Sequence, residues 1–247
     1  MTELNLQTRT GNSPVYVLNC FIQGFKMLAK PELRKFLIIP LMINLILYTV
    51  ILALGYYYVA GLIEQFIPSW IDWLSWLIWP LFFISFFVIG FFTFTLLANL
   101  IAAPFYSKLA AKTVATLTGQ SDTEIFEQPA LKSIMSELRR IIYILLRALP
   151  LLILFIIPGL NLLAPILWLL FVAWCLALEY MAYPLENRGL LFEDQRLMVK
   201  SKRMGALSFG GLVVVGLSIP IINIILPPVT VIAATLYFQG VQEQHDL

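Results

Sequence analysis

Long stretches without a charged residue alternate along this chain with shorter segments that hold the charges. Two of these stretches, 36–63 and 73–107, each exceed the ~20 residues that an α-helix needs to cross ~30 Å of hydrocarbon. We therefore expect a transmembrane helix over each. The connecting segment 64–79 is rich in Trp, which is enriched at membrane interfaces, so we expect it to graze one membrane surface.

The second half of the chain is equally apolar but is interrupted. The charge-free stretches 148–178 and 204–242 contain helix breakers at Pro158, Gly159, Pro165, Pro220, Pro227 and Pro228. The pieces between these breakers are short for a comfortable span. Two proline-broken helical hairpins, 148–184 and 204–242, fit better than four independent helices, and each either crosses the membrane or enters it partway.

Three more polar segments complete the expected architecture. Asn-Ser-Pro opens an interfacial amphipathic helix over 12–30, since Pro suits the first helical position. Segment 108–147 is expected to be a cytoplasmic amphipathic segment, because residues 122–147 alternate Glu, Lys and Arg with apolar residues at helical spacing. Segment 185–203 predicts a cytoplasmic loop. The fold expected is an all-α integral membrane protein that forms one transmembrane domain over 1–247.

Composition and charge support this class and give an orientation. The 247 residues are 60% hydrophobic and 12% charged, whereas soluble domains have about 25% charged residues. All 16 basic residues lie in Arg9–Lys35, Lys108–Arg147 and Arg188–Arg203, and segment 64–79 has none. Because cytoplasmic loops carry the excess of Lys and Arg, both termini are expected in the cytoplasm.

Signatures of enzymes are missing from the chain. The only histidine is His245, close to the C-terminus, and no GxxxxGK[ST] loop is present. Cys20 and Cys175 stand alone in apolar sequence and are interpreted as packing residues. We expect no enzyme, no cofactor, no metal site and no nucleic-acid partner, and a lipid bilayer as the environment.

The two interruptions form a weak internal repeat. Both 157–165 and 219–227 read I-P-x-x-N-x-x-x-P, with Asn161 and Asn223 in register. Paired interruptions of apolar segments indicate a transporter binding site. Pro and Asn are also common in ordinary turns, so a plain hairpin turn is the alternative interpretation.

The first interruption has the composition of an anion site. Gly159 lets a ligand approach the backbone, and the helix expected to start near Leu162 presents free N–H groups and the positive end of its dipole. Asn161 either caps that helix or donates to a ligand through its NH2 group. Arg34 and Lys35, at the start of the first span, either supply positive charge to an anion or simply flank the membrane.

Two other charged residues lie within or beside apolar sequence. Glu179 either pairs with a base such as Arg188 near the cytoplasmic end of its helix, or couples transport to protons. Arg147 precedes the first hairpin, and we expect its long side chain to reach the interface.

An ordered set of motifs over more than 200 residues resembles the CysZ-type sulfate permeases of bacterial inner membranes. The set comprises F-x-x-G-F-K with K-P-E-L-R-K-F (21–36), N-L-I-A-A-P-F (99–105), I-P-G-L-N with A-P-I-L-W-L-L-F (157–171), Y-x-x-Y-P-x-x-N (180–187), and I-P-x-x-N-x-x-x-P with A-A-T (219–235).

The resemblance implies a function and a set of site residues. It implies sulfate uptake into the cytoplasm for assimilation into cysteine, by a homo-oligomer without an ATPase subunit. It implies two long transmembrane helices and two hairpins that penetrate the membrane incompletely. Sulfate binding would involve G-L-N, here Gly159, Leu160 and Asn161, and a basic pair, here Arg34 and Lys35. That pair is usually two arginines in the family, and Lys35 lacks the bidentate fork.

Two rival functions remain open at this point. One is a structural membrane scaffold whose hairpins only anchor it. The other is a proton-coupled anion carrier that uses Glu179.

Overall fold

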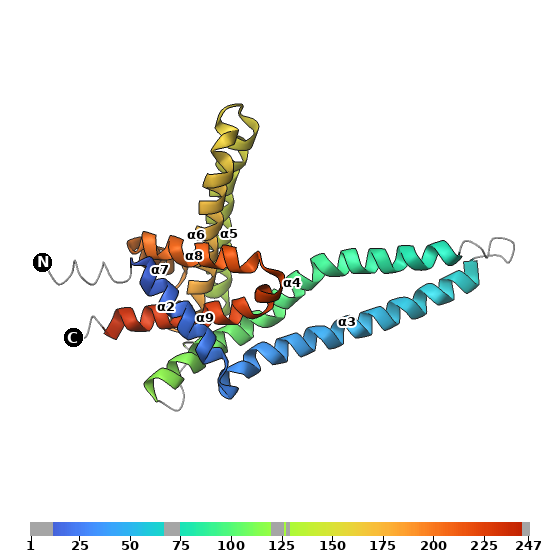
Figure 1. Cartoon of the computed structure of the whole chain (residues 1–247), viewed down its shortest axis with the longest axis horizontal. Helices are drawn as coiled ribbons and strands as arrows, with labels where there is room; N and C mark the ends of the chain where they lie inside the picture. The colour runs from blue at the N-terminus through green and yellow to red at the C-terminus, as the bar shows by residue number, and fades with distance from the viewer. Residues whose placement is uncertain (1–11, 67–74, 120–125, 127–128, 244–247) are drawn as a thin grey trace, which may run out of the picture. The chain divides into compact units, whose positions relative to one another are not determined.

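The structure is a computed structural model that describes residues 12–66, 75–119, 126 and 129–243 (Figure 1). Within these ranges the secondary structure is helical without any strand, which confirms the all-α prediction. Segment 67–74, half of the Trp-rich connection, and His245 lie outside the described residues. The elements are α2 (Pro14–Leu28), α3 (Pro31–Phe66), α4 (Ser75–Thr118), α5 (Ala130–Ile156), the short 3₁₀ helix η2 (Leu160–Leu162), α6 (Ala164–Glu186), α7 (Phe192–Ser201), α8 (Arg203–Leu217) and α9 (Pro220–Glu243).

Three of the described helices are long and apolar enough to cross a membrane. These spans are Pro31–Gly61 in α3, Ala164–Glu186 in α6, and Ile222–Gly240 in α9. Only 11% of the span in α3 is buried inside the structure, against 67% of the span in α9. The apolar surface of α3 therefore needs lipid or another protein to cover it, whereas α9 is mainly covered by its own chain.

The chain divides into two compact units, and one of them is residues 35–105, with most of α3 and α4. Within this unit the Tyr56 and Trp79 rings stack with their centroids 4.6 Å apart, and the Tyr48 hydroxyl donates to the Gly90 carbonyl over 3.1 Å. Tyr48 precedes Tyr56 in α3, whereas its partner Gly90 follows Trp79 in α4. The two helices therefore run antiparallel. Both helices exceed the expected limits: α3 begins at Pro31 rather than 36, and α4 continues past 107 to Thr118.

The other unit comprises residues 1–34 and 106–247, and its core lies where α2, α8 and α9 meet. The Phe21 and Phe209 rings lie 4.9 Å apart, and Phe209 also contacts Tyr237 of α9. The Tyr16 hydroxyl donates to the Tyr237 carbonyl over 3.2 Å. Aromatic contacts and one half-buried hydroxyl thus join the N-terminal helix to the last helix of the chain.

The helix expected over 12–30 is α2, and it has two apolar faces. Its buried face packs on α9 and α8 through Val17, Cys20, Phe21, Gly24 and Leu28. Its opposite face carries Val15, Leu18, Ile22 and Phe25, all exposed and spaced by three or four residues. This second stripe suits a helix whose outer side meets the membrane interface.

The start of α2 differs from the expected capping pattern. Ser13 occupies the position before the helix, but its side chain makes no capping hydrogen bond. Asn12 instead accepts a hydrogen bond from the backbone N–H of Gly205, 3.2 Å away in the first turn of α8. The Asn-Ser-Pro sequence therefore both opens one helix and caps another.

The first hairpin is formed by α5 and α6. Helix α5 continues through Pro150 without interruption, so the expected amphipathic segment and the first arm of the hairpin are parts of one helix. The chain then turns over 157–163, at the free end of the hairpin in Figure 1, and returns as α6.

The second hairpin is formed by α8 and α9, and here part of the prediction was wrong. The turn comprises only Ser218 and Ile219, and α9 begins at Pro220. Pro227 and Pro228 lie inside α9 and do not cut it. Because α9 packs against α2, α6 and α8, these neighbours hold it helical through both prolines. The expected loop 185–203 likewise contains a helix, α7.

Candidate functional site

Gly159 forms the turn at the tip of the first hairpin. Its φ of 86° lies in the left-handed region that favours glycine, and a Cβ added there would meet nothing within 4 Å. The conformation of the backbone, and not a lack of space, therefore requires glycine. The open space also leaves this stretch of backbone accessible to a ligand.

Asn161 does not cap a helix. Its backbone N–H donates to the Ile157 carbonyl over 3.0 Å, whereas its exposed side chain makes no hydrogen bond with the described residues. Helix α6 begins at Ala164, two residues later than expected, and no side chain caps it. The capping interpretation of Asn161 was therefore wrong, and its amide is free to contact a ligand.

The first turn of α6 adds backbone donors beside Asn161. An α-helix leaves the N–H groups of its first turn without intrahelical partners. Leu163 donates to the Leu160 carbonyl over 3.0 Å, and Pro165 has no N–H, so Ala164 and Ile166 remain. Leu160, the middle residue of the G-L-N motif, is exposed beside them. The tip thus combines an amide side chain with two backbone donors and the positive end of a helix dipole.

Arg34 and Lys35 lie in the first turns of α3. The Arg34 backbone N–H donates to the Lys30 carbonyl over 3.0 Å, and the Lys35 ammonium lies 5.7 Å from the Phe36 ring centroid. Both side chains are exposed, and neither has an ion pair within the described part of the chain. No described contact joins Arg34 to the hairpin tip.

Glu179 is exposed on α6, and no ion pair with Arg188 or any other described base holds it. The expectation that Glu179 pairs with Arg188 was therefore wrong. Arg188 is half-buried after the end of α6, and this burial lowers the pKa of its guanidinium.

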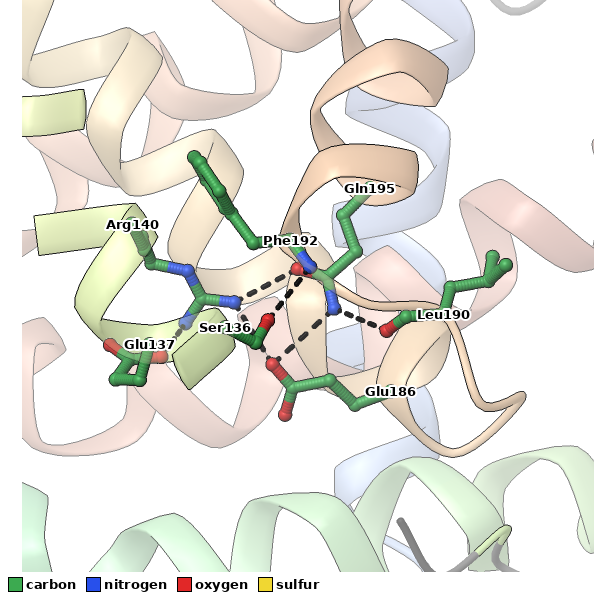
Figure 2. Close-up of polar contacts among 7 residues, drawn as sticks. All are labelled: Ser136, Glu137, Arg140, Glu186, Leu190, Phe192 and Gln195. Atoms are coloured by element: carbon green, nitrogen blue, oxygen red, sulfur yellow. Dashed lines mark hydrogen bonds and ion pairs between the residues drawn. The ribbon is translucent and has the colours of Figure 1, made fainter. Parts of the chain in front are cut away.

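A polar network that sequence reasoning missed joins α5 to the end of α6 and to α7 (Figure 2). Its centre is Arg140, whose side chain is only 11% exposed and pairs with Glu137 over 2.8 Å and with Glu186 over 2.9 Å. Arg140 also donates to the side-chain oxygen of Gln195 over 2.9 Å. Three helices thus meet at one guanidinium group.

Gln195 and Ser136 complete this network. The Gln195 amide is 1% exposed and donates to the Leu190 carbonyl over 2.8 Å, and the Ser136 hydroxyl accepts from the Phe192 backbone N–H over 2.8 Å (Figure 2). Because buried polar groups are stable only when they are paired, the network fixes α7 against the base of the first hairpin. The spacing of Glu137 and Arg140 was the only signal for it in the sequence.

The chain matches known proteins along most of its length. Residues 20–228 match the family model described as Sulfate transporter CysZ/Etoposide-induced protein 2.4. A protein named Sulfate transporter CysZ from Pseudomonas aeruginosa is 37% identical over 87% of this chain and 91% of its own length. Proteins of the same name from Pseudomonas syringae and Vibrio parahaemolyticus are 38% and 36% identical, over 87% and 94% of this chain and 88% and 95% of their own lengths. This chain therefore belongs to the Sulfate transporter CysZ/Etoposide-induced protein 2.4 family.

Proposed function

We propose that this protein is a sulfate permease of the bacterial inner membrane and not an enzyme. It would carry sulfate into the cytoplasm for assimilation into cysteine. The observation that carries the proposal is the match to proteins named Sulfate transporter CysZ over 87–94% of the chain, together with the family model over residues 20–228, a range that contains the hairpin tip.

The tip of the first hairpin is the proposed sulfate site. Sulfate oxygens would accept hydrogen bonds from the Asn161 amide and from the backbone N–H groups at the start of α6, at Ala164 and Ile166. Gly159 and Leu160 shape the turn before these donors, where Ile166 is exposed and Ala164 is buried. Helix ends alone contribute only about 0.3–1 kcal/mol each at exposed sites, so a second source of positive charge is needed.

Arg34 and Lys35 are the proposed source of that charge. They lie at the start of α3 and have no ion pair within the described residues. Since no described contact brings Arg34 to the tip of its own chain, the basic pair acts at another point of the path or at the tip of a neighbouring copy in a homo-oligomer. Both termini lie in the cytoplasm in this proposal, because the basic segments flank the apolar spans on one side.

Proton-coupled transport is a second candidate mechanism, and one observation favours it. Glu179 is an exposed carboxylate in a span of α6, and it has no ion pair within the described residues. A carboxylate in that position is free to take up and release a proton. In this version, uptake would fail when the proton gradient is removed, and also in the Glu179→Gln variant.

The test is uptake of radiolabelled sulfate into liposomes that contain only this protein, with and without a proton gradient. Uptake well above that of empty liposomes supports the permease, and uptake equal to theirs overturns it in favour of a structural scaffold. Loss of uptake in Asn161→Ala and in Arg34→Ala supports the proposed residues. If neither substitution changes uptake, the permease function still holds, but the proposed sulfate-binding residues are wrong.

A further inference from the structure

Four basic side chains line a cavity of about 300 Å³ at the junction of α5, α6, α7 and α8. We call it the basic pocket, and its lining is Tyr143, Arg147, Trp174, Arg196, Lys200, Arg203 and Leu207. None of the predicted sulfate residues takes part. A water molecule occupies about 30 Å³ in the liquid, so the pocket has room for a tetrahedral anion with several waters.

One tyrosine organises two of the guanidinium groups. The Arg147 Cζ lies 3.7 Å from the Tyr143 ring centroid, and the Arg196 Cζ lies 5.3 Å from it. The Tyr143 hydroxyl accepts a hydrogen bond from the Trp174 indole N–H over 3.1 Å, so its own hydrogen remains for another acceptor. The ring therefore fixes two planar donors of positive charge beside a hydroxyl donor.

The charge in the basic pocket is not balanced by the protein. Arg196 pairs with Glu193 over 2.8 Å, and this is the only ion pair that the described residues give to the four bases. Arg147, Lys200 and Arg203 have no carboxylate partner among the described residues, and no acidic side chain lines the cavity. Several cations around one cavity repel each other, and an anion placed between them removes that repulsion.

We propose that the basic pocket is an oxyanion-binding site, which holds a tetrahedral sulfate or phosphate group between α5, α7 and α8. Guanidinium groups offer paired N–H donors that match two oxygens of such a group, and Lys200 adds a mobile point charge. The group belongs either to free sulfate, which rests on the proposed function, or to the phosphate of an anionic phospholipid.

The basic pocket is distinct from the hairpin tip. Arg147 lies nine residues before the end of α5 at Ile156, which corresponds to about 14 Å along a helix that rises 1.5 Å per residue. Under the positive-inside orientation the pocket lies toward the cytoplasmic end of the hairpin, and the tip lies deeper in the membrane or at its far side. Free sulfate in this pocket would therefore occupy a second position along the same hairpin.

The first arm of the test measures sulfate. Binding of radiolabelled sulfate is followed by equilibrium dialysis with the purified full-length protein in detergent without added phospholipid. We expect Arg147→Gln with Arg203→Gln to remove one bound sulfate per chain, and Lys200→Gln to weaken that binding about tenfold, since a hydrogen bond to a charged group has about this effect. Lys132→Gln with Arg139→Gln removes two exposed charges of α5 outside the pocket and is the matched control, which we expect to bind as the wild type.

The second arm measures lipid. Native mass spectrometry compares adducts of phosphatidylglycerol with adducts of phosphatidylcholine, for the wild type and the same variants. Loss of the phosphatidylglycerol adduct in the pocket variants and not in the control identifies the lipid as the source. Loss of sulfate binding in the pocket variants, with the phosphatidylglycerol adduct unchanged, identifies free sulfate as the source. If the double substitution prevents folding, Lys200→Gln decides, because Lys200 is exposed and has no described partner.

One result overturns the proposal: sulfate binding and lipid adducts that change no more in the pocket variants than in the control. Sulfate uptake by the wild type in phosphatidylcholine liposomes is measured separately. Uptake together with unchanged binding in the pocket variants overturns the basic pocket alone. Absent uptake together with pocket-dependent anion binding overturns the proposed function alone.

Discussion

Gly210 of α8 lies directly against the backbone carbonyl of Ala173 of α6, so that a Cβ at position 210 would overlap the carbonyl oxygen. The two helices cross at this contact, and it brings the second hairpin onto the second arm of the first. The next residue, Gly211, faces open space, with nothing within 4 Å of an added Cβ. Position 210 therefore has no room for a Cβ, whereas position 211 does.

The first prediction compares these two positions. Gly210→Ala should lower the free energy of unfolding by about 3 kcal/mol, because overpacking costs about 1–3 kcal/mol and a backbone carbonyl cannot move aside as a side chain can. Gly211→Ala should be neutral or stabilise by up to about 1 kcal/mol, since Ala favours helices more than Gly. Thermal unfolding in detergent, followed by circular dichroism, measures both. Equal stability of the two variants would contradict the close approach.

The second prediction concerns the hairpin tip. Asn161→Ala should reduce sulfate uptake tenfold or more without changing the unfolding temperature, because the side chain makes no described hydrogen bond in the protein and binds only the anion. Asn223→Ala is the matched control from the other copy of the repeat. It is also exposed, has isoleucine and not glycine two residues before it, and should change neither quantity. A fall in uptake of equal size in both variants would argue against a single anion site at the first tip.

Gly159→Ala gives a third prediction at the same turn. An L-residue in the left-handed region costs roughly 1–2 kcal/mol, and the φ of 86° at Gly159 imposes this conformation. The variant should therefore lose about that much stability, and the tip should also rearrange and lose uptake. Unlike Asn161→Ala, it should alter both the unfolding temperature and the uptake, and an unchanged unfolding temperature would show that the turn is relaxed.

The fourth prediction concerns the polar network of Figure 2. Arg140→Gln removes two ion pairs and leaves the buried oxygen of Gln195 without its donor, so it should cost about 2–3 kcal/mol. Arg139→Gln, at the adjacent exposed position, should stay within about 0.5 kcal/mol of the wild type. Chemical denaturation of both variants measures the difference. A change near zero in the free energy of unfolding of Arg140→Gln would mean that water replaces the hydrogen bonds and ion pairs of Arg140 without loss of stability.

The fifth prediction concerns a thiol. Cys20 is 4% exposed, and burial raises the pKa of its thiol to about 11, against a weaker opposing effect of its hydrogen bond with Tyr16. In a Cys175→Ser background, maleimide at pH 7.5 should label the folded protein only after denaturation.

The same pKa predicts how stability changes with pH. The unfolded thiol ionises at about pH 8.5, and the folded thiol ionises near 11. Between these values the unfolded chain binds fewer protons than the folded chain, so the free energy of unfolding contributed by Cys20 falls as the pH rises across that window. Cys20→Ala should make the pH dependence there shallower, and an unchanged slope would contradict the raised pKa.

The apolar stretches and the position of the first hairpin tip could be predicted from the sequence. Charge-free length requires helices in a membrane, and Pro158 next to Gly159 breaks one of them. The prediction that Pro227 and Pro228 break the helix was wrong. A proline costs the interior of an isolated helix about 3 kcal/mol, but packing from three neighbouring helices offsets that cost in α9.

Contacts between distant residues could not be predicted. The hydrogen bond of Asn12 with Gly205 joins positions 193 apart, and nothing in either local sequence indicates the other. Arg196, Lys200 and Arg203 looked like ordinary cytoplasmic charges that flank a span, and only the fold gathers them with Arg147 around one cavity. A single sequence records which residues are charged, but the folded chain determines which charges meet.

The two adjacent prolines inside α9 have a consequence for hydration. Proline has no N–H, so Pro227 and Pro228 leave the carbonyl groups of Asn223 and Ile224, four residues earlier, without their usual helical donors. Both of these residues are exposed. Hydrocarbon offers no donor to a bare carbonyl oxygen. This edge of the second hairpin must therefore stay wet or lie against another polypeptide, and lipid tails cannot cover it.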